Sequence, residues 1–176
     1  NYHYYYLILW PNNIYIMNLQ TLDKNLKKIL IYYLITLGVG FSLGVLYVYL
    51  NSEFSASGMI EQYLGNNDEW EPKLPKTLQD LVSHTHEHIT MFSIIFLSLG
   101  LIFLYNNTIK GFWKRFLMLE PFVSIIITFG GFFIIRYVTT TFSYIIMISS
   151  LLMYICFYVM LIISLYELIF LNKNKS

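Results

Sequence analysis

The sequence predicts an all-α integral membrane protein whose four transmembrane helices form an up-down bundle with both termini cytoplasmic. Three observations predict this fold: composition, four long apolar runs, and a one-sided distribution of Lys and Arg. Of the 176 residues, 57% are hydrophobic and only 12% are charged, whereas soluble domains carry about 25% charged residues. The formal net charge of +1 offers no basic surface for nucleic acid. A single cysteine cannot form an internal disulfide.

The four apolar runs cover 29–50, 89–105, 116–135 and 138–166. The first run contains no charged residue and can cross a ~30 Å hydrocarbon core at ~1.5 Å per residue. We interpret it as an uncleaved signal anchor, because no A-x-A-like cleavage site follows it. The second run is expected to start earlier as a helix, since Thr77 is a good N-cap and Asp80 suits the first turn.

The distribution of charge predicts the orientation in the membrane. Eight of the eleven Lys and Arg residues lie on one side of a four-span arrangement: Lys24, Lys27, Lys28, Lys110, Lys114, Arg115, Lys173 and Lys175. The loop 51–83 instead holds six acidic residues against Lys73 and Lys76. The positive-inside rule therefore puts both termini in the cytoplasm and this loop outside. We expect a multi-pass protein of the inner (cytoplasmic) membrane.

The chain divides into three parts by this interpretation. An N-terminal tail covers 1–28, a four-helix transmembrane domain covers 29–170 with its outer loop at 51–83, and a C-terminal tail covers 171–176. The first methionine is Met17, so we expect the native chain to start at or near this residue; otherwise residues 1–16 form an interfacial tail with Tyr and Trp at the headgroup level. His3 is left out of the functional argument for that reason.

Small residues in the apolar runs indicate close helix packing. Gly40 and Gly44 form a GxxxG pattern in the first run, and Ser124, Thr128 and Gly131 follow at helical spacing in the third. Such patterns let helix backbones approach one another. We expect both sets to pack within the bundle rather than to form a dedicated dimer face.

Three polar residues in the last two runs are expected to have structural roles. Glu120 and Glu167 map to the inner membrane boundary, where we expect them to be solvated or paired with neighbouring basic residues. Cys156 lies in the middle of the fourth run and is expected to behave as a small buried hydrophobe.

The one dense polar cluster is the hexapeptide 83–88, which contains three of the four histidines. On a helix, Asp80, His84, Glu87, His88 and Met91 share one face. His84 and His88 lie one turn apart and suit two ligands of a transition-metal ion, with Glu87 as a third. The alternative is that the cluster is solvated at the membrane–water boundary.

Two more specific chemistries need additional ligands. Residues 84–88 contain the letters H-x-x-E-H of the inverted zincins, but their downstream acidic ligand is lacking, because Glu120 and Glu167 map to the opposite membrane boundary. Haem b between two histidines normally needs one histidine on each of two helices, and the other runs contain none. Haem would therefore require Met147 or a second copy of the chain, so it is the less favoured cofactor.

Arg136 and Tyr137 lie at the same membrane boundary as the histidines. An arginine near a bilayer must either snorkel to the interface or pair with an acidic group. It is therefore a candidate partner of Asp80 or Glu87. Arg136 and Tyr137 together are a candidate anchor for an anionic headgroup or cofactor carboxylate. Interfacial snorkelling is the simpler interpretation.

These observations leave two classes of function open. One is a membrane protein with an outer-face histidine and carboxylate site that binds a transition metal or haem in a redox or metal-handling role. The other is a non-catalytic accessory subunit, or a homodimer, that packs beside other membrane proteins and holds no cofactor. No catalytic motif is found, which favours a non-enzymatic role. The direction in which His84 and His88 face distinguishes the two classes.

Overall fold

The structure, a computed structural model, describes residues 18–66, 70 and 72–171. Within these residues four helices are long and apolar enough to cross a membrane. They are α1 (Lys24–Ser52), α3 (Leu78–Leu104), α4 (Gly111–Tyr137) and α5 (Ser143–Ile169). Three shorter elements are η1 (Leu19–Thr21), α2 (Ala56–Leu64) and η2 (Thr140–Phe142). The predicted all-helical membrane fold is confirmed.

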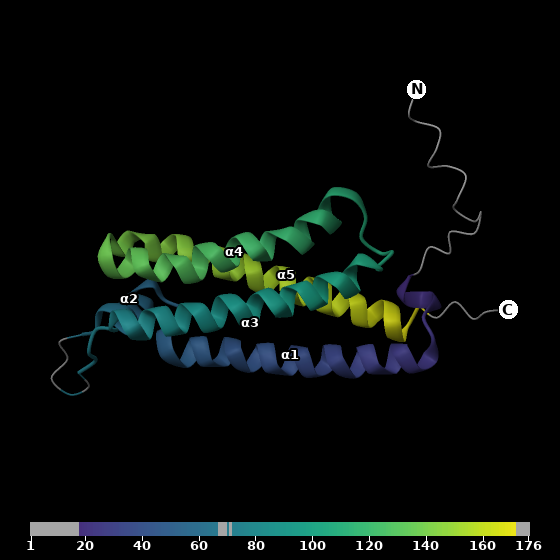
Figure 1. Cartoon of the computed structure of the whole chain (residues 1–176), viewed down its shortest axis with the longest axis horizontal. Helices are drawn as coiled ribbons and strands as arrows, with labels where there is room; N and C mark the ends of the chain where they lie inside the picture. Colours follow the sequence, from purple (N-terminus) through teal and green to yellow (C-terminus); the bar gives the residue numbers. More distant parts are fainter. Residues whose placement is uncertain (1–17, 67–69, 71, 172–176) are drawn as a thin grey trace, which may run out of the picture.

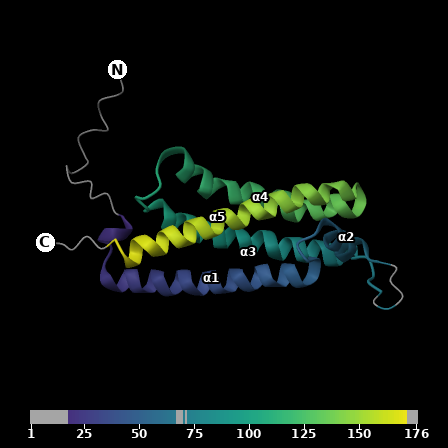
Figure 2. The same cartoon turned by 180° about the vertical axis from the view of Figure 1, so that it is seen from behind.

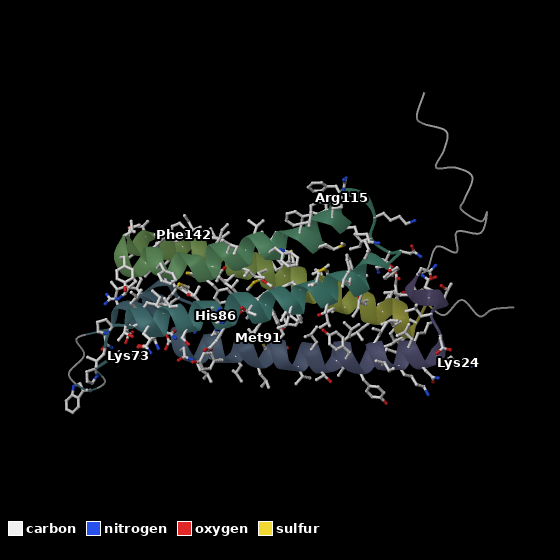
Figure 3. The ribbon with its side chains drawn as sticks, viewed as in Figure 1. Lys24, Lys73, His86, Met91, Arg115 and Phe142 are labelled. Atoms are coloured by element: carbon white, nitrogen blue, oxygen red, sulfur yellow. The ribbon has the colours of Figure 1, made fainter. Side chains whose placement is uncertain are left out.

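The long helices run side by side in alternating directions (Figures 1 and 2). The start of α1 and the end of α5 lie together at one end of the bundle, which we call the terminal end. The loop 105–110 is also at this end. Helix α2 lies at the opposite end, which we call the capped end. Lys24 and Lys73 mark the two ends in Figure 3.

Helix α3 begins where its capping signal predicts. The Thr77 hydroxyl accepts a hydrogen bond from the Asp80 backbone amide at 3.1 Å, and Asp80 Oδ2 accepts one from the Thr77 amide at 3.2 Å. This reciprocal pair satisfies amides that have no partner within the helix. Because α1 ends at Ser52 and α3 starts at Leu78, the connecting segment is 53–77 and contains α2, a helix that the sequence did not predict.

Helix α4 continues through Pro121 without a break. Proline has no backbone N–H and cannot bond to the carbonyl of Leu117, which favours a bend at this point. The first turns of α4 diverge from α5 in Figure 1, whereas the later turns of α4 run close beside it.

Helix α1 is the least buried of the four spans. Its inward face carries Leu34, Gly38 and Phe41, and the Phe41 ring stacks on Phe157 of α5 at 3.6 Å between centroids. The expectation that Gly40 and Gly44 pack inside the bundle is wrong. Both are exposed with open space where a Cβ would lie, because positions 34, 38 and 41 define the helix face that turns inward.

The carboxyl group of Glu167 is not solvated, which corrects the sequence prediction for this residue. Glu167 is fully buried, and its Oε1 atom accepts hydrogen bonds from the loop 105–110. Glu120 is half-buried and accepts a hydrogen bond from the Ser124 hydroxyl. Lys114 instead donates from Nζ to the backbone carbonyls of Leu104 and Asn106. Cys156 is fully buried, as predicted.

Candidate functional site

The two histidines of α3 face the interior of the bundle. His84 and His88 are half-buried, and the centroids of their imidazole rings are 4.0 Å apart. Two aromatic side chains of α4 lie against them: the Phe132 ring is 5.8 Å from His84, and the Phe129 ring is 5.0 Å from His88. Helical spacing of i and i+4 puts both imidazoles on this side of α3.

Tyr63 of α2 completes the enclosure of His84. Its hydroxyl and Nε2 of His84 share a hydrogen bond of 3.2 Å, and its ring stacks on Phe132 at 4.3 Å. Only 5% of Tyr63 is exposed. Burial raises the pKa of Tyr63 above its ordinary value, so the phenol keeps its proton at neutral pH. Helix α2 is thus joined to the bundle through a polar contact.

Sequence reasoning missed Tyr63 because it missed α2. One local signal could have found this helix: Ser55 is a favoured N-cap residue. Its hydroxyl accepts a hydrogen bond from the Gly58 amide at 2.9 Å. The tyrosine is the eighth residue of this nine-residue helix, and it points at α3 and α4 because both rings that it contacts belong to those helices.

A hydrogen bond to the backbone determines which ring nitrogen of His88 carries the hydrogen. Nδ1 of His88 lies 2.8 Å from the carbonyl oxygen of His84. A carbonyl oxygen only accepts hydrogen bonds, so Nδ1 carries the hydrogen and the lone pair of neutral His88 is on Nε2. The Nε2 atom is therefore the position through which His88 can bind a cation. This arrangement resembles the way proteins orient histidine ligands through the second ring nitrogen.

The remaining polar residues of the cluster lie outside this pair. Glu87 is exposed, and its Oε1 atom accepts a hydrogen bond of 2.8 Å from the Ser83 hydroxyl. His86 is also exposed, on another side of α3 (Figure 3). Asp80 is engaged with Thr77 at the start of the helix. Within the described residues, no three His, Cys, Asp or Glu side chains come together in a way that could hold a metal ion.

Arg136 connects α4 to the segment before α3. Its Nε donates to the carbonyl oxygen of Lys76 at 3.2 Å, and its guanidinium carbon lies 5.6 Å from the centroid of the Tyr137 ring. In the part of the chain that the structure describes, it forms no ion pair with Asp80 or Glu87. Arg136 therefore fastens the connecting segment to the capped end.

The polar groups that Tyr63, His84 and His88 bring together inside the bundle are thus two imidazoles and one phenol. Imidazole nitrogens bind zinc, copper, iron and nickel. A protonated phenol contributes a hydrogen bond rather than an anionic ligand. The aromatic side chains around the histidines lower the local polarity, which strengthens any polar interaction formed there.

Comparison with known proteins gives one match, to the family called Aq_1264_TM, described as a transmembrane helical domain. It covers residues 53–175, which contain α2 to α5 and exclude α1. The chain belongs to this family. No curated protein and no solved structure matches it. The chain is therefore a multi-pass membrane protein of the Aq_1264_TM family, and the Tyr63, His84 and His88 arrangement lies wholly within the matched domain.

Proposed function

We propose that this membrane domain binds a transition-metal ion at the capped end, with His84 and His88 as ligands, in a metal-handling or redox role. The observation that carries the proposal is that both imidazoles face the bundle interior with their centroids 4.0 Å apart. Histidines that were merely interfacial would face lipid and water instead.

The residues fit such an ion only in part. The hydrogen bond from His88 Nδ1 to the His84 carbonyl leaves Nε2 of His88 for the ion. Nε2 of His84 shares a hydrogen bond with Tyr63, so it would bind the ion only after this contact is released. A further ligand would come from water, or from Glu87 after its side chain leaves Ser83. Haem b remains the less favoured cofactor, because two histidines on one helix cannot bind opposite faces of one porphyrin. Arg136 and Tyr137 are proposed as an anchor for an anionic group at the same end.

Metal titration of the purified protein tests this proposal. Detergent-solubilised protein is equilibrated with Zn²⁺, Cu²⁺, Co²⁺ or Ni²⁺, freed of unbound metal by gel filtration, and analysed by mass spectrometry. We expect His84→Ala and His88→Ala each to lower affinity strongly, because each removes one of two ligands. His86→Ala is the matched control, since this side chain is exposed on the same helix turn. Equal and negligible effects of all three substitutions would contradict the metal site.

A second function is favoured by helix α1. This helix exposes most of its apolar surface, including Gly40 and Gly44, and it lies outside the matched family domain. Exposed small residues permit another transmembrane helix to approach closely. In an accessory subunit or a homodimer without a cofactor, this surface of α1 would contact a transmembrane helix of the partner protein. Loss of a co-purifying partner or of dimers on Gly40→Leu, with metal content unchanged, would support this second function over the first.

A further inference from the structure

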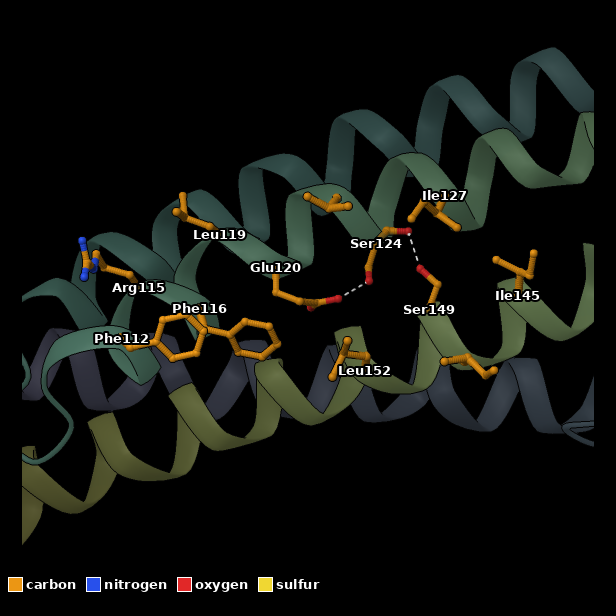
Figure 4. A pocket seen from close by; sticks show the side chains of 12 residues that line it. Phe112, Arg115, Phe116, Leu119, Glu120, Ser124, Ile127, Ile145, Ser149 and Leu152 are labelled. Atoms are coloured by element: carbon orange, nitrogen blue, oxygen red, sulfur yellow. Dashed lines mark hydrogen bonds between the residues drawn. The ribbon is translucent and has the colours of Figure 1, made fainter.

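A groove of about 850 Å³ opens between α4 and α5 (Figure 4). Its α4 wall extends from Phe112 to Ile127, on both sides of Pro121, and its walls are mostly apolar, including Phe116, Ile148 and Leu152. The volume falls within the ~300–1,000 Å³ typical of small-molecule sites. Because both helices cross the membrane, the molecules that can reach this groove from the side are lipophilic.

Apart from the exposed Arg115 near the start of α4, the polar groups that line the groove are gathered around Glu120. Ser124 donates a hydrogen bond to Oε1 of Glu120, and the Ser149 hydroxyl donates to the Ser124 backbone carbonyl at 3.3 Å. The second carboxyl oxygen of Glu120, Oε2, is buried and has no hydrogen-bond partner within the described residues. The thiol of Cys156, a weak donor, also neighbours this carboxyl. An unpaired buried carboxyl oxygen is costly, so it points to a ligand that donates a hydrogen bond.

The depth of Glu120 restricts which lipophilic molecule can donate this hydrogen bond. Helix α4 has 27 residues and is ~40 Å long, about 10 Å longer than the hydrocarbon core. Glu120 is nine residues beyond Gly111, which puts it ~14 Å along the helix; with the helix centred on the hydrocarbon core, this is ~9 Å inside the hydrocarbon. Phospholipid headgroups lie outside this layer. The donor must therefore belong to a ligand whose polar group enters the apolar region.

The aromatic residue beside Glu120 indicates the shape of that ligand. Phe116 precedes Glu120 by one helical turn, so its ring and the carboxyl lie on the same side of α4, as Figure 4 shows. An aromatic ring of a ligand can pack against Phe116 in an offset or edge-to-face arrangement. Beyond Glu120 the groove continues between Ile127, Ile145 and Ile148, which provide an apolar path for a hydrocarbon tail.

From these observations we propose that the α4–α5 groove binds an isoprenoid quinol. Its ring packs against Phe116, one ring hydroxyl donates a hydrogen bond to Oε2 of Glu120, and the isoprenoid tail runs along the apolar part of the groove. The proposal concerns binding alone and is independent of the histidine pair at the capped end.

Retention of a short-chain quinol by the purified full chain tests the proposal. Protein in detergent is equilibrated under argon with reduced ubiquinone carrying two isoprene units, separated from free ligand by gel filtration, and the bound ligand is extracted and quantified. Loss of the hydrogen bond in Glu120→Leu is expected to weaken binding about tenfold. Ile148→Trp is expected to abolish binding by filling the groove. Ile126→Trp is the matched control, because Ile126 is an exposed residue of α4 outside the groove.

A second ligand keeps the test independent of how the variants fold. The same quinol with both ring hydroxyls methylated retains its ring and tail but cannot donate. We expect it to bind wild-type protein about tenfold more weakly than the quinol. Equal retention of the two ligands by wild-type protein would overturn the proposal and indicate an unspecific lipid groove. Retention unchanged by Ile148→Trp, in protein with wild-type circular dichroism, would overturn it as well.

Discussion

Oε1 of Glu167 accepts two hydrogen bonds from Thr108, one from its backbone amide and one from its hydroxyl, each 2.6 Å long. The Asn107 amide donates a third to the same oxygen at 2.8 Å. One carboxyl oxygen of α5 thus holds the loop between α3 and α4. The amides of this tight loop have no helix partners, so they depend on the buried side chain.

Glu167→Leu is therefore expected to destabilise the bundle by about 3 kcal/mol, because it leaves several loop donors without an acceptor. Glu167→Gln should cost less, since its amide carbonyl can still accept. Thermal unfolding in detergent, followed by circular dichroism, measures the difference. Glu53→Leu is the control, because Glu53 is exposed beyond the end of α1. Similar melting temperatures for Glu167→Leu and wild type would contradict the capping role of Glu167.

The long helices could be predicted because their signals are local. Apolar runs set the four spans, and the Thr77 and Asp80 pair marks the start of α3 by backbone chemistry alone. The rotation of each helix about its axis could not be derived in the same way. The face of α1 that turns inward is decided by the fit of Gly38 and Phe41 against Leu161 and Phe157, which are contacts between distant segments.

Only part of the candidate site could be predicted, because the rest depends on contacts between distant segments of the chain. Helical spacing shows that His84 and His88 share a face, but the side chains that they meet belong to other helices. Tyr63 comes from a helix of only nine residues, whose amphipathic pattern covers too few turns to stand out in the sequence. The burial of Glu167 was missed because a carboxyl group near a membrane boundary is usually solvated, and here three donors of one loop replace the water.

The contact between Tyr63 and His84 predicts an effect of alkaline pH on α2. Because burial raises the pKa of Tyr63, the folded state keeps the phenolic proton that the detached state loses above about pH 10. Stability of the attached helix is therefore fully present below pH 10 and falls as the pH rises further. A fluorescent dye on Ser57→Cys, in a Cys156→Ser background, reports detachment. In Tyr63→Phe this pH dependence should be absent, whereas Tyr144→Phe, which removes an exposed phenol of α5, should leave it unchanged.

The segment before α3 is expected to resist proteolysis. The Lys73 side chain forms an ion pair with Glu61 at 3.1 Å, the Lys76 amide donates to the Tyr63 carbonyl at 3.1 Å, and Arg136 binds the Lys76 carbonyl. Trypsin should therefore cleave slowly after both lysines. Arg136→Leu removes the contact with α4 and should accelerate cleavage several-fold, as detected by mass spectrometry of the fragments. Rapid cleavage of the wild type at low trypsin concentration would contradict a fastened segment.

The orientation in the membrane is tested by labelling cysteines at the two ends of the bundle. Ser57 lies in α2 at the capped end and Asn107 lies in the loop at the terminal end, and both are exposed. The excess of Lys and Arg around the terminal end predicts that this end is cytoplasmic. In intact cells, a membrane-impermeant maleimide should therefore modify Ser57→Cys and spare Asn107→Cys, both in a Cys156→Ser background. After permeabilisation both positions should react, which shows that Asn107→Cys is accessible once the reagent enters. Labelling of Asn107→Cys alone in intact cells would reverse the orientation and put the histidine pair at the cytoplasmic end.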